Sequence, residues 1–245
     1  MSESVRYWAV VPAAGVGKRM RADRPKQYLP LAGRTVIEHT LQRFIDHPRI
    51  AGMVVALSAE DAYWPQLRVA SDKPLLRVDG GAERADSVLN ALRALAREAA
   101  ARDWVLVHDA ARPCLHPSDL DALIVSLADD AIGGILAVPV RDTMKRADDQ
   151  GRIARTEERT GLWHALTPQM FRLGALTDAL ERAAAAGASV TDEASAFEHL
   201  GLRPRLVEGR GDNIKITRPE DLALAEFFLR ERVREEGAIS RRRGA

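Results

Sequence analysis

The sequence predicts an α/β protein with a mostly parallel central sheet, and three observations lead to this prediction. Short apolar runs alternate with segments of helical period through the first half of the chain, which is the pattern of βαβ units. Two of these runs, residues 7–11 and 104–108, are apolar almost throughout, as strands buried on both faces of a sheet are. The chain has 245 residues, of which 46% are apolar and 29% charged, so it can form one large or two small domains with a sizeable core.

The elements of the first half follow from these runs in chain order. Apolar runs predict strands over residues 7–11, 53–57, 74–78, 104–108 and 134–138. Apolar residues at a period near that of an α-helix predict helices over 35–45 and 85–102, and a further helix opens at Pro117. We expect Ser118 to be the N-cap of that helix, because Asp121 follows three residues later.

Residues 141–164 interrupt this alternation. They are polar, and a turn-like segment that ends at Gly151 predicts a hairpin that leaves the main body. Beyond it, the pattern predicts helices over 174–186 and 192–200, a strand over 205–207 and a last helix from about Pro219. We expect Thr191 to cap the second of these helices, and Thr217 with Glu220 to form a capping box on the last. The prediction is therefore one domain over 1–236, with an arm at about 140–160 and a disordered tail over 237–245.

Charge and cysteine content exclude several classes of protein. The 36 Lys and Arg residues nearly cancel the 35 Asp and Glu residues, which leaves a formal net charge of +1. Such a chain has no strong overall field for nucleic acid or an anionic membrane, so any basic site must be local. The single cysteine, Cys114, excludes an intrachain disulfide framework and fits a reducing cytoplasm. The first apolar run ends at Pro12, far short of a signal peptide or a membrane span, so we expect a cytoplasmic protein.

The loop that follows the first predicted strand has the residues of a phosphate-binding loop. Gly15 and Gly17 let backbone N–H groups approach a phosphate closely, and Lys18 and Arg19 supply charge at the same place. The loop lacks the spacing of a P-loop, and Met20 stands where a dinucleotide fingerprint has its third glycine. The pattern favours a cradle for a triphosphate, and a plain βα turn with solvated basic residues is the alternative.

Two more motifs could complete an anion site beside this loop. Pro25 and Pro30 restrain the backbone around Lys26, so that its ammonium can be held at a defined point on a transferring phosphoryl group. Asp109 and Arg112 follow the predicted strand over 104–108, and ligands of open α/β sheets lie outside the carboxyl ends of strands. Asp109 would then hold Mg²⁺ against the phosphates, with Arg112 as a second anion partner. An Asp/Arg pair that only caps a loop is the alternative.

The neighbouring histidine is not expected to be a base. Transfer of an already ionised phosphate needs no proton removed, so we expect His108 to be packed or hydrogen-bonded. Three groups later in the chain, within 141–146, 159–167 and 212–217, combine cations with Thr, Asp or Asn. Such groups suit a small phosphorylated substrate with hydroxyls, because Arg and Lys bind the phosphate and neutral polar groups bind hydroxyls.

With these residues in view, the chain resembles the 2-C-methyl-D-erythritol 4-phosphate cytidylyltransferase family of the non-mevalonate isoprenoid pathway over roughly residues 10–228. The resemblance rests on eight motifs in order: Pro12-Ala-Ala-Gly-x-Gly-Lys-Arg-Met20, Pro25-Lys-Gln-Tyr28, Gly80-Gly-x-x-Arg84-x-x-Ser87-Val88, His108-Asp-Ala-Ala-Arg-Pro113, Pro139-Val-Arg-Asp-Thr143, Thr167-Pro-Gln169, Thr191-Asp-Glu193 and Asp212-Asn-Ile-Lys215. The first two alone would mark only the wider nucleotidyltransferase group.

The resemblance implies a three-layer, Rossmann-like nucleotidyltransferase domain with a mostly parallel central sheet. It also implies a projecting β-arm at about 140–160 that embraces a second copy in a homodimer and contributes to the neighbouring site. The implied reaction transfers a cytidylyl group from CTP to 2-C-methyl-D-erythritol 4-phosphate, with Mg²⁺ as the cofactor. The acceptor phosphate would attack the α-phosphate of CTP in line and release pyrophosphate.

The resemblance also implies roles for individual residues. Cytosine and ribose would be held by Ala13, Ala14, Gly15, Gly81 and Ser87, and the triphosphate by Gly17, Lys18, Arg19 and Lys26. Mg²⁺ would be ligated by Asp109. The acceptor would be positioned by Arg112, Thr143, Arg159, Thr167 and Lys215. Charge gathers in the transition state when one anionic phosphate approaches another, and fixed cations must match it. We therefore expect Arg19, Lys26, Arg159 and Lys215 to be the catalytic residues, without a covalent intermediate or a general base.

Three other functions remain open on the sequence alone. A cytidylyltransferase for another polyol phosphate, such as ribitol 5-phosphate, would share the nucleotide half of the site. A dinucleotide-binding oxidoreductase would explain the first strand and its loop, but the third glycine is absent. A non-catalytic nucleotide sensor would bind CTP without turnover.

Overall fold

Seven strands form the central sheet of the computed structural model, which describes residues 4–15, 20 and 22–243, with side chains up to 235. From one edge to the other they are β11 (Arg205–Glu208), β7 (Gly133–Pro139), β10 (Trp163–Arg172), β6 (Trp104–Val107), β1 (Tyr7–Pro12), β4 (Ile50–Leu57) and β5 (Leu75–Asp79). Every pairing is parallel except the two that β10 makes with β6 and β7. The prediction of a mostly parallel α/β sheet is confirmed.

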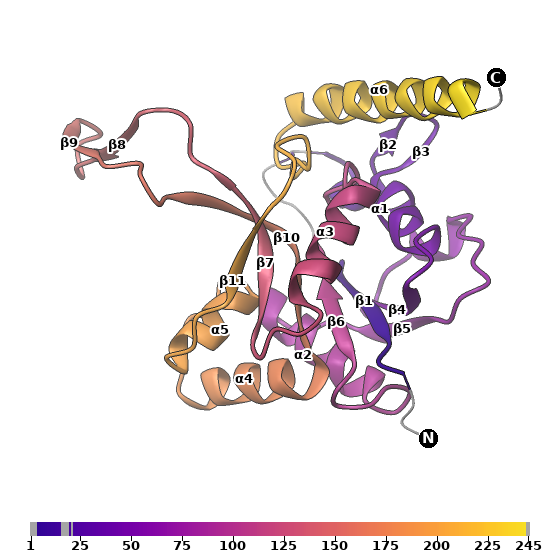
Figure 1. Cartoon of the computed structure of the whole chain (residues 1–245), viewed down its shortest axis with the longest axis horizontal. Helices are drawn as coiled ribbons and strands as arrows, with labels where there is room; N and C mark the ends of the chain where they lie inside the picture. The colour runs from indigo at the N-terminus through magenta and orange to yellow at the C-terminus, as the bar shows by residue number, and fades with distance from the viewer. Residues whose placement is uncertain (1–3, 16–19, 21, 244–245) are drawn as a thin grey trace.

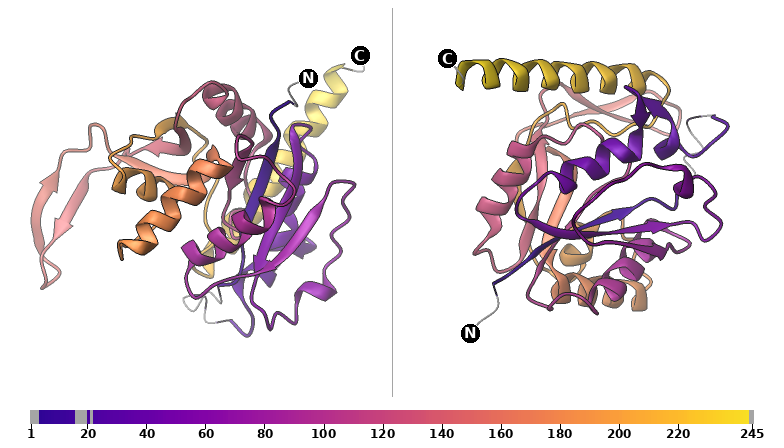
Figure 2. Two further views of the ribbon diagram at one scale, coloured as in Figure 1. Left: turned by 90° about the horizontal axis from the view of Figure 1, so that it is seen from below. Right: turned by 90° about the vertical axis from the view of Figure 1, so that its right-hand side faces the viewer.

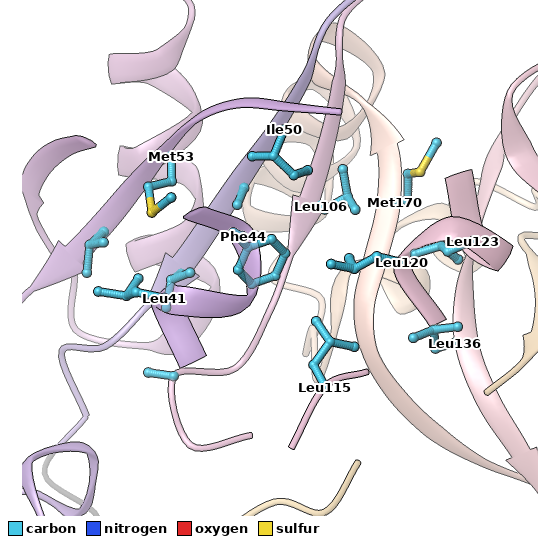
Figure 3. Packing of buried hydrophobic residues seen from close by; sticks show 14 of the residues in the cluster. Leu41, Phe44, Ile50, Met53, Leu106, Leu115, Leu120, Leu123, Leu136 and Met170 are labelled. Carbon is cyan, nitrogen blue, oxygen red and sulfur yellow. The ribbon is translucent and has the colours of Figure 1, made fainter. Parts of the chain in front are cut away.

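Helices cover both faces of the sheet and make it the middle of three layers (Figure 1). On one face, α1 (Val36–Ile45) and α3 (Pro117–Leu127) pack over a core that includes Phe44 and Leu106, which Figure 3 shows from close by. On the other face, α2 (Arg84–Leu95), α4 (Leu173–Ala185) and α5 (Glu193–His199) pack over a second core. Side chains alternate between the two cores along β1, because successive residues of a strand point to opposite faces.

A third, smaller core lies beneath the last helix, α6 (Glu220–Arg243). Ala225 and Leu229 of α6 pack there with Leu31 and Ile216. Leu31 belongs to the short strand β2 (Pro30–Leu31), which pairs with β3 (Arg34–Thr35). Figure 1 shows α6 lying across β2 and β3. The helix extends through residues 237–243, where the sequence predicts a disordered tail.

The predicted hairpin is present as a projecting arm. Strands β8 (Met144–Ala147) and β9 (Ile153–Glu157) pair antiparallel and stand off the body in Figures 1 and 2. The carboxylate of Asp148 accepts from the backbone N–H groups of Gln150 and Arg152 and so closes the turn. Gly151 lies in the turn at φ 75°, a conformation that glycine adopts without strain.

Two predicted elements differ from the observed ones. The helix predicted over 85–102 ends at Leu95, because residues before β6 form a turn instead. The carboxylate of Asp103 fixes this turn by accepting from the backbone N–H groups of Ala100 and Arg6. Strand β10 was not predicted at all, although it lies between β6 and β7. Between the described elements are also two short 3₁₀ helices, η2 (Lys26–Tyr28) and η3 (Trp64–Gln66).

Three predicted helix caps are wrong, each by one or two positions. His116, not Ser118, caps α3, because Pro117 takes the first helical position and the His116 ring accepts the Ser118 N–H. Asp192, not Thr191, caps α5 by accepting from the Ser195 N–H at 3.0 Å. At α6 the carboxylate of Asp221, not Glu220, accepts from the backbone N–H of Thr217 at 2.8 Å.

Within the part of the chain that the structure describes, no helix combines the length and apolar character that crossing a bilayer requires.

Candidate active site

A pocket of about 220 Å³ opens where several strands of the sheet end. Its walls come from the segment after β1 (Ala13, Ala14 and Gly15), the segment after β5 (from Gly81 to Ser87) and the segment after β6 (Asp109, Ala110 and Ala111). Lys26 of η2 and Lys215 also line the pocket. Loops at the carboxyl ends of parallel strands are the usual ligand site of open α/β sheets.

The segment after β1 is held from two sides. The Ala13 N–H donates to the carbonyl of Ala56 at 2.7 Å, and the amide of Gln27 donates to the Ala13 carbonyl at 2.6 Å. Gln27 is 3% exposed, so this bond fixes the loop against η2 from within the core. Gly17, Lys18 and Arg19, for which the sequence predicts a triphosphate-binding role, lie outside the described residues.

The segment after β5 has no space for a side chain at its glycines, and the hydroxyl of Ser87 makes hydrogen bonds within the segment. A Cβ on Gly81 would come within 2.2 Å of the Asp86 Cβ, so no larger residue fits at that wall. Ser87 Oγ accepts from the Gly81 N–H at 3.0 Å and donates to the Glu83 carbonyl at 3.1 Å. Ser87 is therefore placed to hold the shape of the wall around Gly81.

Asp109 is the electrostatic centre of the pocket. Its Oδ1 accepts from Arg84 Nε at 3.1 Å, and its Oδ2 lies 2.9 Å from Lys215 Nζ and 3.4 Å from Arg112 Nε. Burial alone would raise the pKa of Asp109, but Arg84, Lys215 and Arg112 together outweigh burial and hold that pKa far below its usual range. Asp109 is therefore ionised at any physiological pH, and its charge keeps three cations at one edge of the sheet.

Two of the predicted acceptor-binding residues lie behind Asp109 and do not line the pocket. Arg112 is 8% exposed and donates to the carbonyl of Asn213 at 2.7 Å. Thr167 is 4% exposed, and its hydroxyl accepts from the Asp109 N–H at 3.2 Å. Thr167 Oγ1 also lies 2.9 Å from Nδ1 of His108. These residues orient Asp109 and the segment that carries Lys215.

His108 is packed, as the sequence predicts. It is fully buried, and its Nε2 lies 3.0 Å from the carbonyl of Arg112. Burial lowers the pKa of His108 to about 4, so the ring is neutral at neutral pH. Its role is to join the β6 loop to β10 through Thr167.

Lys26 and Lys215 enter the pocket from neighbouring segments. Lys26 Nζ donates to the carbonyl of Ile216 at 2.8 Å, so η2 is tied to the residue after Lys215. Both ammonium groups therefore reach the pocket from one connected wall, although Lys26 and Lys215 lie 189 positions apart in the chain.

The two remaining predicted residues belong to the arm. Thr143 precedes β8 and is exposed, and Arg159 follows β9 and donates to the carbonyl of Arg141. Neither lines the pocket of its own chain. The structure thus brings together Asp109, Lys26 and Lys215 with the loop residues, but not Thr143 and Arg159.

Two charged residues of the site were given no role on the sequence alone. Arg84 lines the pocket and donates to Asp109, and it also pairs through both Nη atoms with Glu193 of α5. Glu193 follows the predicted cap Thr191 by two positions, where acids are common in the first turn of a helix. The sequence shows that Arg84 and Glu193 carry opposite charges and lie in two separate motifs, but it does not show which acid pairs with which arginine.

A small-residue loop after β1, a cation-rich pocket at the carboxyl ends of parallel strands and one ionised carboxylate at its centre define an α/β enzyme of the nucleotidyltransferase class. The family model of IspD, 2-C-methyl-D-erythritol 4-phosphate cytidylyltransferase, matches residues 7–231. The chain belongs to this family.

Individual relatives agree with the family match. A 2-C-methyl-D-erythritol 4-phosphate cytidylyltransferase of Ectopseudomonas mendocina is 64% identical over 221 residues, which cover 90% of this chain and 94% of the relative. A crystal structure of a 4-diphosphocytidyl-2C-methyl-D-erythritol synthase superposes with a TM-score of 0.81 at 40% identity, covering 92% of this chain and 99% of that one. The Thermus thermophilus cytidylyltransferase superposes with a TM-score of 0.75 at 30% identity, covering 92% and 100%.

Proposed function

We propose that this enzyme transfers the cytidylyl group of CTP to 2-C-methyl-D-erythritol 4-phosphate and releases pyrophosphate at the pocket beside β1 and β6. The observation that carries the proposal is the cluster at Asp109, where Arg84, Arg112 and Lys215 meet one carboxylate. An oxygen of the acceptor phosphate forms a bond to the α-phosphorus of CTP, and the bond from that phosphorus to the β-phosphate bridge breaks. Both partners are anions, so the site must supply positive charge.

The nucleotide would occupy the part of the pocket made by small residues. Ala13, Ala14 and Gly15 after β1 and Gly81 after β5 line this part with small side chains or none, so a base and a ribose can approach the backbone closely. Ser87 would support this contact by holding the Gly81 wall. The triphosphate would lie against Lys26, together with Gly17, Lys18 and Arg19, which precede it in the chain.

Lys26 and Lys215 would supply charge on the two sides of the reacting phosphate. Lys26 would stabilise the charge that develops on the α-phosphate. Lys215 would leave Asp109 for the acceptor phosphate and hold it in line with the bond that breaks. Arg112 and Thr167 would keep Asp109 and the Lys215 segment in place from behind.

Asp109 fits a magnesium site that is completed by substrate. Among the described residues, no group of three or more His, Cys, Asp or Glu side chains can hold a metal ion without help. Mg²⁺ is usually bound by one or two carboxylates together with substrate phosphates, and Asp109 provides one such carboxylate on the pocket wall. When bound, Mg²⁺ would neutralise phosphate charge beside Asp109.

The arm would complete the site of a second copy in a homodimer. Thr143 and Arg159 are exposed on a hairpin that stands off its own body (Figure 2). An exposed arm with hydroxyl and guanidinium groups at its base suits a phosphate that approaches from a neighbouring subunit. Arg159 would then hold the acceptor phosphate across the subunit boundary.

The proposed activity is tested by pyrophosphate release from CTP with 2-C-methyl-D-erythritol 4-phosphate and Mg²⁺, with ribitol 5-phosphate as the competing acceptor. We expect release with methylerythritol phosphate and a much lower kcat/KM with ribitol 5-phosphate. Equal or higher kcat/KM with ribitol 5-phosphate would reassign the acceptor. CTP binding by calorimetry without pyrophosphate release from either acceptor would support the nucleotide sensor instead.

A further inference from the structure

Arg84 lies between two carboxylates that come from different parts of the fold. Its Nε donates to Asp109 Oδ1 at 3.1 Å, while Nη1 and Nη2 donate to the two oxygens of Glu193 at 2.6 Å and 3.1 Å. Glu193 is 1% exposed and does not line the pocket. A forked guanidinium–carboxylate pair of this kind fixes the plane of the arginine as well as its position.

Glu193 is itself held firmly by the start of α5. The Gln169 side chain of β10 accepts from the Ala194 N–H at 2.9 Å and donates to Asp192 at 2.9 Å. Asp192 in turn caps the helix by accepting from the Ser195 N–H. The first turn of α5 is therefore tied to the central sheet, so Glu193 is a fixed anchor for Arg84.

The three cations that meet Asp109 are not held equally. Arg84 is fixed by Glu193, and Arg112 donates to a backbone carbonyl at 2.7 Å. The Lys215 side chain is 39% exposed, against 29% for Arg84 and 10% for Arg112. Lys215 also lines the pocket, so it is the cation that can leave Asp109 most readily when an anionic ligand arrives.

We propose that Glu193 is a positioning residue for the transfer reaction, because it restricts Arg84 to a single contact with Asp109. While Glu193 holds both Nη atoms, only Nε reaches Asp109, and it reaches Oδ1. The Oδ2 atom is left to Lys215 and Arg112, and it is the oxygen at which Lys215 can exchange with a ligand. This inference rests on the function proposed above.

Loss of the Glu193 charge would change this geometry in a defined way. The guanidinium of Arg84 would be free to rotate and to form a forked pair with both oxygens of Asp109. Such a pair would compete with Lys215 for Oδ2 and with Mg²⁺ for the carboxylate. Partners behind a metal ligand typically change metal affinity or activity by about 10- to 100-fold when they are lost.

The first test compares Glu193→Gln with Glu198→Gln, a control at an exposed position of the same helix. For Glu193→Gln we expect a loss of about 10-fold or more in kcat and a similar rise in the Mg²⁺ concentration that gives half-maximal rate. CTP affinity is measured by calorimetry with Mg²⁺ and with EDTA. We expect it to fall only with Mg²⁺, whereas a general loss of structure would weaken both affinities alike and overturn the proposal.

The second test asks whether Glu193 acts through Arg84, and it remains decisive if Glu193→Gln alone is poorly folded. A lysine at position 84 cannot form a forked pair with either carboxylate, so in Arg84→Lys the loss of Glu193 has no guanidinium to redirect onto Asp109. Adding Glu193→Gln to Arg84→Lys should therefore leave the Mg²⁺ dependence unchanged, whereas the same change in the wild-type chain raises the Mg²⁺ requirement. A further rise in the Mg²⁺ requirement when Glu193→Gln is added to Arg84→Lys would overturn the proposal. Failure of the proposed function would differ, because the wild-type protein would then release no pyrophosphate.

Discussion

Asp109 at the end of β6 and Glu157 on the arm are both carboxylates between arginines, but their surroundings differ. Asp109 is 8% exposed and meets Arg84, Arg112 and Lys215. Glu157 pairs with Arg146 and Arg155, whose side chains are 58% and 62% exposed. Asp109 is buried, and Arg84 and Arg112 beside it are anchored by Glu193 and by the Asn213 carbonyl, whereas the two arginines at Glu157 are mostly exposed.

The difference shows why two similar clusters of charged side chains contribute differently to stability and to the geometry of a site. Ion pairs in water contribute little, because solvent screens them and the side chains must be ordered. A buried carboxylate that meets several cations is held in a defined geometry, and removal of one partner is costly. The wall at Asp109 is therefore built before any ligand arrives, while the charges of the arm can acquire a fixed position only against another molecule.

The largest expected effect is that of Asp109→Asn on stability. The change leaves three cations facing a neutral amide, and breaking a buried ion pair in this way costs about 3–5 kcal/mol in free energy of unfolding. Urea unfolding followed by circular dichroism measures the loss. Glu157→Gln is the matched control on the arm, where we expect no measurable change. Equal losses in the free energy of unfolding of Asp109→Asn and Glu157→Gln would contradict the difference in stability that we expect between the pocket and the arm.

Lys26→Ala tests whether the ammonium group of Lys26, which lines the same pocket as Asp109, stabilises negative charge in the transition state. We expect kcat to fall by ~10²-fold or more, as loss of a comparable transition-state donor does. The measurement is pyrophosphate release at saturating CTP and acceptor. Arg24→Ala, at an exposed cation two residues away that pairs with Asp23, should retain near-normal kcat. A near-normal kcat in Lys26→Ala would show that Lys26 does not have this role.

Arg159→Ala tests the arm, where we expect about a 10- to 100-fold loss in kcat/KM for the acceptor. If Arg159 acts across the subunit boundary, Arg159→Ala and Lys26→Ala chains, each impaired alone, should recover activity when they are unfolded together and refolded. A mixed dimer then carries one site with both changes and one intact site, so an equal mixture should reach about a quarter of wild-type activity. No recovery, with mixed dimers present by native mass spectrometry, would place Arg159 in the site of its own chain.

The sequence predicted the parts of the site that depend on strand ends. The loop after β1 and Asp109 could be assigned together because the carboxyl ends of parallel strands meet at one edge of the sheet. Lys215 was assigned by resemblance, and the structure places it 2.9 Å from Asp109. The pairing of Arg84 with Glu193 could not be predicted, because these residues lie 109 positions apart and many acids could have met that arginine.

Strand β10 was missed for a different physical reason. Pro168 lies in its middle, and a proline cannot donate to the ladder of a central strand, so the pattern argues against a strand there. The structure accommodates it with a shift in register between Ala165 and Gln169 on the side that faces β7. Such an irregularity depends on the neighbouring strand, which a local sequence pattern does not reveal.

The smallest expected effect concerns Asp119, a buried carboxylate that accepts from a backbone N–H, whereas Asp109 pairs with three cationic side chains. Asp119 is 4% exposed, in the first turn of α3, and accepts from the backbone N–H of Arg210 at 3.3 Å. Burial raises the pKa of Asp119 from 3.8 to about 6. The folded chain therefore holds this proton more tightly than the unfolded chain, so the free energy of unfolding falls as pH rises from about 4 to about 6.

Asp119→Asn should remove this cost, because the amide oxygen can still accept from Arg210 without carrying a charge. We expect the free energy of unfolding to rise by about 1–2 kcal/mol at pH 7.5 and to change little at pH 4, where the wild-type carboxyl is already protonated in the folded chain. Urea unfolding at the two pH values measures the difference. An equal effect at both pH values, or destabilisation at pH 7.5, would mean that the charge of Asp119 is compensated in the folded chain as that of Asp109 is.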